Sequence, residues 1–265
     1  MKQILLVILI LLNITAFAIK PERVYKWTPA TRGLAYVEYQ VETPDKFAIN
    51  VWEYGVTDSA KTTRTVIFVG SDAGNMSYMI YHAFAFLEKG IRVVSFDYRG
   101  FGKSADFEIN SELLFHPEFA LDLDSVIKAT RAKYPNDIVG LYAMSMGTYI
   151  SLIRKEKIDF LVAEGFYSDP LKVVDRIKIN RNRAVLLPAG AKAIQKLRNT
   201  PVLIFCASDD KTTVTADARE FSKKNKVRII EFKGEHLQGI SIMTKETIGD
   251  EYSERVLEFL MASKL

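Results

Sequence analysis

Residues 141–150 read LYAMSMGTYI, and this stretch decides the fold. An apolar run ends here in a lone serine, Ser145, with the small residues Ala143 and Gly147 two positions to either side. A strand that turns at once into a helix needs small residues at these positions, because the chain before and after the turn is crowded. The pattern therefore predicts a sharp strand–turn–helix elbow that exposes the Ser145 hydroxyl above a sheet.

A serine at this point could instead simply cap the helix that follows it. The elbow supports a second hypothesis, in which Ser145 is a nucleophile and the N–H of Met146, at the start of the helix, donates to an oxyanion. The two readings differ in what else the chain must contain, because a nucleophilic serine needs a base and a group that orients the base.

Both groups have candidates downstream of Ser145. Where such an elbow is catalytic, the acid and then the histidine follow the serine in the chain, and His236 is the one histidine of the three that does so. The stretch IFCASDDKTT (204–213) ends a strand-like run with two adjacent carboxylates. Asp210 stands three residues past the small Ala207, the usual interval for the acid; Asp209 remains the alternative, since a loop slip of one residue would exchange them.

A second oxyanion donor is expected from the loop after the first central strand, VGSDAGNMS (69–77). Small residues there allow the backbone to turn an N–H inward. The backbone N–H of Asp72 is the preferred candidate, with that of Ser71 second.

Composition limits the class of protein. The chain has 265 residues, of which 48% are hydrophobic and 26% charged, as expected for a globular protein with a sizeable core. We expect one domain over residues 19–265. The net charge of +4 is mild, and no basic–aromatic motif accompanies it, so nucleic acid is not an expected partner.

The first eighteen residues, MKQILLVILILLNITAFA, have the features of a secretory signal peptide. A basic Lys2 precedes an apolar run from Ile4 to Leu12, and Ala16 and Ala18 form an A-x-A cleavage site. We expect cleavage after Ala18 and a secreted or periplasmic protein. An uncleaved N-terminal membrane anchor is the alternative.

The rest of the chain alternates between strand-like and helix-like stretches. Two runs, Tyr36–Glu42 and Phe47–Tyr54, are separated by a turn and predict an antiparallel hairpin. Short runs that are apolar on both faces predict parallel strands at 65–70, 91–97, 137–143, 159–166, 201–207 and 227–232. Helices are expected at 76–89, 117–134, 146–155, 215–224 and 250–263. This order predicts an α/β fold, with a mostly parallel sheet and helices on both faces.

An insert at residues 168–200, between the sixth and seventh expected strands, is the expected cap of the site. It carries eight basic and two acidic residues. Leu171, Val174 and Ile177, and then Leu187, Ala191 and Ile194, recur at helical spacing and predict two short amphipathic helices. Their basic faces could be merely solvated, or could attract an anionic substrate or an anionic membrane surface.

Taken together, these segments resemble the α/β-hydrolase superfamily, and in particular its BEM46-like and serine aminopeptidase-like members. FDYRGFGKS (96–104) is similar to the loop after the fourth strand of that fold, VGSDAGN (69–75) to its oxyanion segment, and AMSMG (143–147) to its elbow. ASDD (207–210) and GEH (234–236) stand where its acid and histidine belong. The resemblance covers about residues 47–260. One departure is Gly70-Ser71, which replaces the family's His-Gly pair.

The resemblance implies acyl transfer by Ser145, His236 and Asp210, with the N–H groups of Met146 and Asp72 as oxyanion donors. A carboxylic ester or thioester with a small or lipid-like acyl group is the expected substrate, and no metal or organic cofactor is needed. A peptidase of the serine aminopeptidase type shares every motif, and a non-catalytic binding protein on the same fold is a third alternative.

Overall fold

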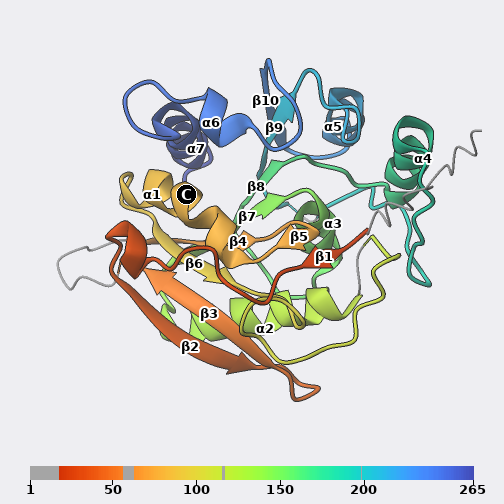
Figure 1. Ribbon diagram of the computed structural model, residues 1–265. Helices are drawn as coiled ribbons and strands as arrows, with labels where there is room; N and C mark the ends of the chain where they lie inside the picture. The colour runs from red at the N-terminus through yellow and green to blue at the C-terminus, as the bar shows by residue number, and fades with distance from the viewer. Residues whose placement is uncertain (1–17, 56–62, 115–116, 198) are drawn as a thin grey trace, which may run out of the picture.

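The computed structural model describes residues 18–55, 63–114, 117–197 and 199–265 (Figure 1). Its central element is an eight-stranded sheet of order β10-β9-β8-β7-β4-β6-β3-β2. The strands are β2 (Tyr36–Glu42), β3 (Ala48–Tyr54), β4 (Arg64–Val69), β6 (Arg92–Phe96), β7 (Ile138–Met144), β8 (Leu161–Glu164), β9 (Val202–Ala207) and β10 (Val227–Phe232). Strand β3 is antiparallel to both of its neighbours, and the other pairs are parallel.

Helices cover both faces of this sheet. They are α1 (Ile80–Leu87), α2 (Pro117–Lys133), α3 (Met146–Ile153), α4 (Pro170–Arg181), α5 (Thr215–Ser222), α6 (Gly239–Ile242) and α7 (Asp250–Ala262), with short 3-10 helices η1 (Ala30–Arg32) and η2 (Met76–Met79). Two core clusters result: α2, α3 and α5 pack on one face, and α1, α6 and α7 on the other (Figure 1). The expected α/β fold with a mostly parallel sheet is confirmed.

The central strands lie where continuous apolar runs predicted them. All four residues of β8 and all six of β9 are buried, because helices cover the sheet on both sides. The hairpin β2–β3 has the expected antiparallel register, from Tyr36 opposite Tyr54 to Glu42 opposite Ala48. Each central strand begins and ends within two residues of its expected bounds, so the apolar runs alone place the strands.

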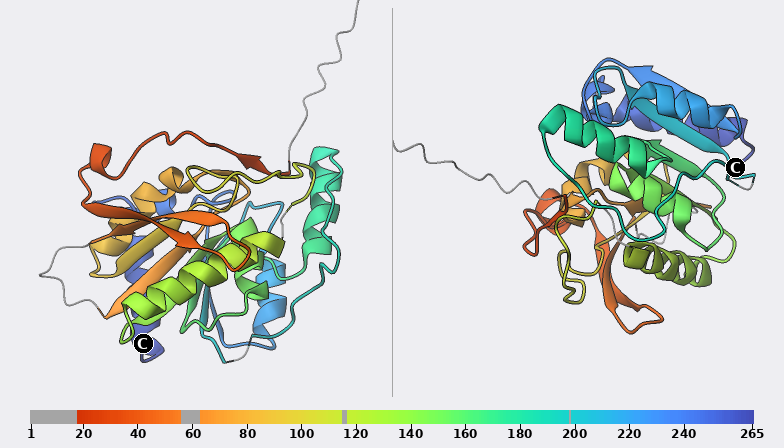
Figure 2. Two further views of the ribbon diagram at one scale, coloured as in Figure 1. Left: turned by 90° about the horizontal axis from the view of Figure 1, so that it is seen from below. Right: turned by 90° about the vertical axis from the view of Figure 1, so that its right-hand side faces the viewer.

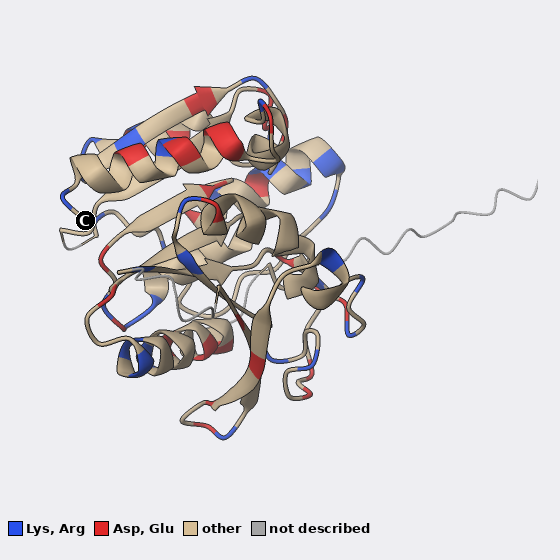
Figure 3. Cartoon of the chain, turned by 90° about the vertical axis from the view of Figure 1, so that its left-hand side faces the viewer, with Lys and Arg blue, Asp and Glu red and all other residues tan. Residues whose placement is uncertain are grey.

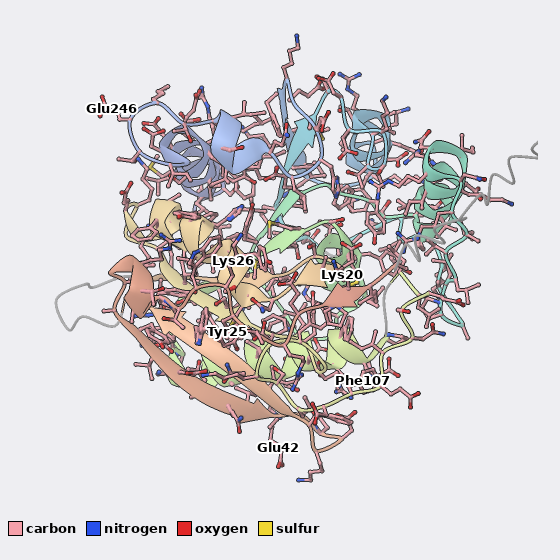
Figure 4. All side chains as sticks on the ribbon, viewed as in Figure 1. Lys20, Tyr25, Lys26, Glu42, Phe107 and Glu246 are labelled. Carbon is pink, nitrogen blue, oxygen red and sulfur yellow. The ribbon has the colours of Figure 1, made fainter. Side chains whose placement is uncertain are left out.

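A second, two-stranded sheet was not foreseen. Strand β1 (Lys20–Pro21) pairs in parallel with β5 (Ala73–Gly74), which belongs to the loop after β4. The N-terminal segment thus runs over that loop, and Lys20 and Tyr25, labelled in Figure 4, lie along its course. Two residues per strand are too few to leave a periodic signal in the sequence.

The insert at 168–200 contains one helix rather than the two expected. Helix α4 begins at the Asp169 N-cap with Pro170 in its first turn and ends at Asn182 in the left-handed conformation. In the described residues that follow, 183–197 and 199–200, the chain forms no helix. The second prediction is therefore wrong: Pro188 and Gly190, the latter at φ +83°, form a turn, and Leu186 instead bridges to Leu113. Both views of Figure 2 show α4 at the periphery of the molecule.

The expected signal peptide lies outside the described residues except for Ala18. Ala18 and Ile19 are both buried, with 3% and 1% of their surface exposed, and the N–H of each donates to the carbonyl of Ser111. Cleavage of the bond between them therefore requires a chain that has not yet folded. Within the described part of the chain, no helix is both long and apolar enough to cross a membrane.

Candidate active site

Ser145 occupies the turn between β7 and α3, with φ +48° and ψ −116°. A positive φ is strained for a residue with a side chain, at a cost of about 1–3 kcal/mol, so its surroundings must hold it in place. The Ser145 N–H donates to the carbonyl of Glu164 at 2.9 Å, and its own carbonyl accepts from the Thr148 N–H at 2.9 Å and the Thr148 hydroxyl at 2.7 Å. The elbow predicted around Ser145 is present.

The small residues around Ser145 have the role that the sequence pattern indicates. A Cβ atom on Gly147 would lie only 2.4 Å from the carbonyl oxygen of Val69 and 2.5 Å from that of Gly70. Ala143, on the other side, is fully buried. The helix start therefore packs directly against the loop after β4, which brings the expected oxyanion loop beside the serine.

The loop after β10 carries His236 to Ser145. The Nε2 atom of His236 lies 2.9 Å from the Oγ of Ser145. A Cβ atom on Gly165, at φ +64°, would lie 2.7 Å from the His236 Cε1, so only glycine lets the ring pack this closely on the end of β8. Leu237, directly after the histidine, is itself at φ +59°.

Asp210, and not Asp209, contacts the imidazole. Its Oδ2 lies 2.6 Å from the His236 Nδ1. The N–H groups of Thr212 and Thr213 donate to its Oδ1 at 2.8 and 2.9 Å, and the Thr213 hydroxyl donates to its Oδ2. Asp209 is exposed and bonds the neighbouring Ser208 hydroxyl.

The surroundings of Asp210 keep it ionised. Burial by itself favours the neutral acid, but the hydrogen bond and charge of His236, together with the donors of Thr213, outweigh it and lower the pKa of Asp210 to about 2. An ionised carboxylate can only accept hydrogen bonds, so the Nδ1 atom of His236 that contacts it must carry the ring proton and donate. That tautomer leaves Nε2 free to accept the proton of the Ser145 hydroxyl.

The two expected oxyanion donors come from two different elements: Met146 follows the serine directly in the chain, and Asp72 belongs to the loop after β4. Met146 is the first residue of α3, where backbone N–H groups have no partner within the helix. Asp72 lies in the loop that packs on Gly147, and its carbonyl accepts from the Lys20 N–H at 2.8 Å. The segment containing β1 therefore holds the Asp72 loop from outside, a contact that sequence reasoning missed.

The side chain of Asp72 adds a charge that sequence reasoning did not consider, since only its N–H was assigned a role. Burial raises the pKa of Asp72, while a hydrogen bond from its own backbone N–H and the charges of His236, Arg181 and Arg183 oppose that rise. The carboxyl group is therefore within electrostatic range of both His236 and the basic end of the cap.

The cap presents less positive charge to solvent than its sequence indicates, because some of its basic side chains form ion pairs. Arg176 forms a two-pronged ion pair with Asp217 of α5, and Lys172 pairs with Glu220 at 2.6 Å. Figure 3 shows the molecule from the side opposite the cap, and there acidic and basic residues are mixed over the helices that face the viewer. Lys178 and Arg181 are exposed, so the charge that the cap presents to solvent depends on these rather than on Arg176.

Thr213 and Gly165 also belong to the site and were not singled out from the sequence. A threonine three residues after an aspartate is a local signal for a side-chain turn, but Thr212 stands in the same relation to Asp209 as Thr213 does to Asp210, so this signal does not separate the two acids. Gly165 gave no such signal. His82, upstream of Ser145, is half-buried, and burial lowers its pKa to about 4; His116 lies outside the described residues. Within the described part of the chain, no three His, Cys, Asp or Glu side chains form a group that could hold a metal ion.

Comparison with known families matches the part of the chain that contains the elbow. The model of the serine aminopeptidase S33 family matches residues 62–157, a stretch that includes Ser145 but ends before Asp210 and His236. No curated protein matches the chain significantly.

Solved structures match over most of the chain. The Pyrococcus furiosus esterase Pf2001 is 22% identical with a TM-score of 0.72, over 92% of this chain and 97% of that one. An esterase from Exiguobacterium antarcticum is 16% identical with a TM-score of 0.62, over 85% of this chain and all of that one. The acylaminoacyl peptidase of Pyrococcus horikoshii is 15% identical with a TM-score of 0.61, over 86% of this chain but only 41% of that one.

Proposed function

We propose that this chain, which has the α/β-hydrolase fold and matches the serine aminopeptidase S33 family over residues 62–157, hydrolyses a carboxylic ester or thioester through an acyl-enzyme. Ser145 is the nucleophile, His236 the base and Asp210 the group that orients it. The N–H groups of Met146 and Asp72 bind the oxyanion. This proposal needs neither a metal nor an organic cofactor.

The reaction follows from the order of the hydrogen bonds. His236 Nε2 takes the proton of the Ser145 hydroxyl as Oγ attacks the carbonyl carbon, and the carbonyl oxygen becomes an oxyanion held by the two N–H groups. His236 then gives its proton to the leaving alcohol or thiol. Water attacks the acyl-enzyme with His236 again as base, which releases the acid and restores Ser145.

One observation carries the proposal: an unbroken chain of contacts joins Ser145 Oγ to His236 Nε2 at 2.9 Å and His236 Nδ1 to Asp210 Oδ2 at 2.6 Å. Ser145, at one end of this chain, has a strained backbone that a merely capping serine does not need. A binding protein without catalysis, the third alternative, would have no use for this combination.

The ester is preferred to the peptide as substrate. The esterase structures match this chain along nearly their whole length, whereas the acylaminoacyl peptidase contains much that has no counterpart here. The match to the serine aminopeptidase family favours a peptidase as the second candidate. Hydrolysis of p-nitrophenyl esters of increasing acyl length, compared with aminoacyl p-nitroanilides, separates the two: faster turnover of the anilides would favour the peptidase.

The nucleophile is tested by Ser145→Ala, which should reduce kcat on p-nitrophenyl butyrate by about 10⁴-fold or more. Ser151→Ala is a matched control, because Ser151 is buried on the same helix and its hydroxyl has no hydrogen-bond partner among the described residues. It should leave kcat unchanged. Equal activity of the two variants would disprove the role of Ser145.

We also propose that residues 1–18 direct the protein to the periplasm or the medium. Mass spectrometry of protein recovered from each fraction should find Ile19 as the N-terminal residue. Recovery of the full chain from the membrane fraction would instead favour an uncleaved anchor.

A further inference from the structure

A second buried carboxylate, that of Glu164, lies beneath the site and has no part in the mechanism above. Glu164 ends β8 and is only 2% exposed. Its side chain is on the face of the sheet where the core cluster contains Tyr142, Ile240 and Tyr252. A carboxylate among apolar side chains is costly to bury unless it is hydrogen-bonded, so its contacts indicate why it is there.

The contacts of Glu164 reach both the serine and the histidine loop. Its main-chain carbonyl accepts the Ser145 N–H at 2.9 Å. Its side-chain Oε1 accepts the N–H of Gly239 at 2.6 Å, and Oε2 accepts the Tyr142 hydroxyl at 3.3 Å. Gly239 is three residues beyond His236, so one residue connects the backbone of the nucleophile to the loop that carries the base.

The contact with Gly239 is close enough to require glycine. A Cβ atom there would lie 2.9 Å from each oxygen of the Glu164 carboxylate and 2.7 Å from the Tyr252 ring. Directly after Glu164, Gly165 provides the surface on which the His236 ring packs. The end of β8 therefore contacts the histidine loop twice, at its ring and at its backbone.

The electrostatic environment of the Glu164 side chain agrees with its position between Ser145 and the histidine loop. Burial raises the pKa of Glu164, and the Gly239 N–H and the charge of His236 both oppose that rise. A buried oxygen that accepts from a backbone N–H also keeps that N–H in place, because leaving a buried polar group without its partner is costly in free energy.

We propose that Glu164 is a positioning residue, which sets the distance between His236 and Ser145 by holding the N–H of Gly239 to the end of β8. This inference rests on the proposed function, since it assigns Glu164 a role in the same site. Glu164 does not touch the reacting atoms. It acts by keeping the Nε2 of His236 within hydrogen-bond distance of the Ser145 hydroxyl.

The test compares Glu164→Met, which removes the acceptor, with Glu164→Gln, which keeps an oxygen for Gly239 and places an NH₂ group at the Oε2 position beside the Tyr142 hydroxyl. Glu164→Met should lower kcat on p-nitrophenyl butyrate about 10²-fold, as expected when a catalytic group is misplaced, with KM nearly unchanged. Glu164→Gln should restore most of that loss. Wild-type kcat in folded Glu164→Met, or an equal loss in both variants, would overturn the proposal.

A control separates positioning from stability. Glu53 on β3 is an equally buried glutamate, held by Lys133 and Tyr134, and three strands separate it from β8. Glu53→Met should lower the melting temperature and leave kcat of the folded protein unchanged. If Glu164→Met does not fold, Gly239→Ala disturbs the same contact from the side of the histidine loop. Gly239→Ala should lower kcat to a similar extent. A wild-type kcat in Gly239→Ala would overturn the proposal.

A substrate-free measurement keeps this test distinct from that of the proposed function. The proton between His236 Nδ1 and Asp210 should give a low-field proton NMR signal in the wild type. Positioning by Glu164 predicts that exchange broadens this signal in Glu164→Met but not in Glu164→Gln. An unchanged signal in Glu164→Met would overturn the role of Glu164 even if the protein proved to hydrolyse no ester at all.

Discussion

Replacement of Asp210 by asparagine tests the proposed mechanism through the tautomer of His236. The N–H groups of Thr212 and Thr213 both donate to Oδ1, so the oxygen of an asparagine amide must take that position. Its NH₂ group then occupies the Oδ2 position, 2.6 Å from the His236 Nδ1. Two donors cannot face each other there, so Nδ1 must become an acceptor and the ring proton must move to Nε2.

A protonated Nε2 cannot accept the proton of the Ser145 hydroxyl. The expected loss in kcat is about 10⁴-fold, by analogy with this substitution in other triads. At 1.36 kcal/mol for each factor of ten, that is about 5 kcal/mol of transition-state stabilisation. The fold should survive, because the amide has the size of the carboxylate and keeps the bonds from the backbone N–H groups of Thr212 and Thr213, while the Thr213 hydroxyl, which donates to Oδ2 in the wild type, turns to accept from the NH₂ group.

The assay is steady-state hydrolysis of p-nitrophenyl butyrate at neutral pH, with circular dichroism to verify the fold. Asp209→Asn is the matched control, since the adjacent carboxylate is exposed and does not contact the imidazole; its kcat should stay within a factor of about two of wild type. A larger loss in Asp209→Asn than in Asp210→Asn would refute the reasoning, as would a loss below tenfold in Asp210→Asn.

Three further predictions follow from the contacts of the elbow, the acid and the cap. The pKa of Asp210 is lowered to about 2 in the folded protein. Its contribution to stability is therefore present above pH 4 and lost as pH falls toward 2. The melting temperature should fall less steeply with decreasing pH in Asp210→Asn than in the wild type. Gly147→Ala should destabilise the protein by about 3 kcal/mol in urea unfolding, since its methyl group meets two carbonyl oxygens, and a loss under 0.5 kcal/mol would contradict that. Reversal of Lys178 and Arg181 to glutamate should slow hydrolysis of anionic but not of neutral esters at low salt, and identical kinetics on both would leave these exposed charges without a role in substrate attraction.

The strands and most helices could be predicted because their signals are local. A run such as 201–207 is apolar throughout, and a covered parallel strand is the structure that such a run favours. The same periodicity argument failed at 187–194, where Pro188 and Gly190 form a turn and Leu186 bridges to a distant segment. The spacing of apolar residues along the chain does not show which distant segment a stretch will pack against.

The candidate site shows the same limit at the level of single residues. Ser145 and His236 could be singled out by residue type and order, but the choice between Asp209 and Asp210 depends on how the loop after β9 turns toward Thr213. Glu164 was missed because a carboxylate at a strand end is usually solvated. Its burial depends on Gly239, 75 positions further along the chain.

The central claim, that Ser145 is an activated nucleophile, is tested most directly by fluorophosphonate labelling of the purified protein with mass spectrometric location of the adduct. The account predicts one adduct per chain, on Ser145, formed at least 10³-fold more slowly in a His236→Ala variant, because the serine then loses its base. An unmodified wild-type protein, an adduct on another residue, or equal labelling rates in the wild type and His236→Ala would contradict it.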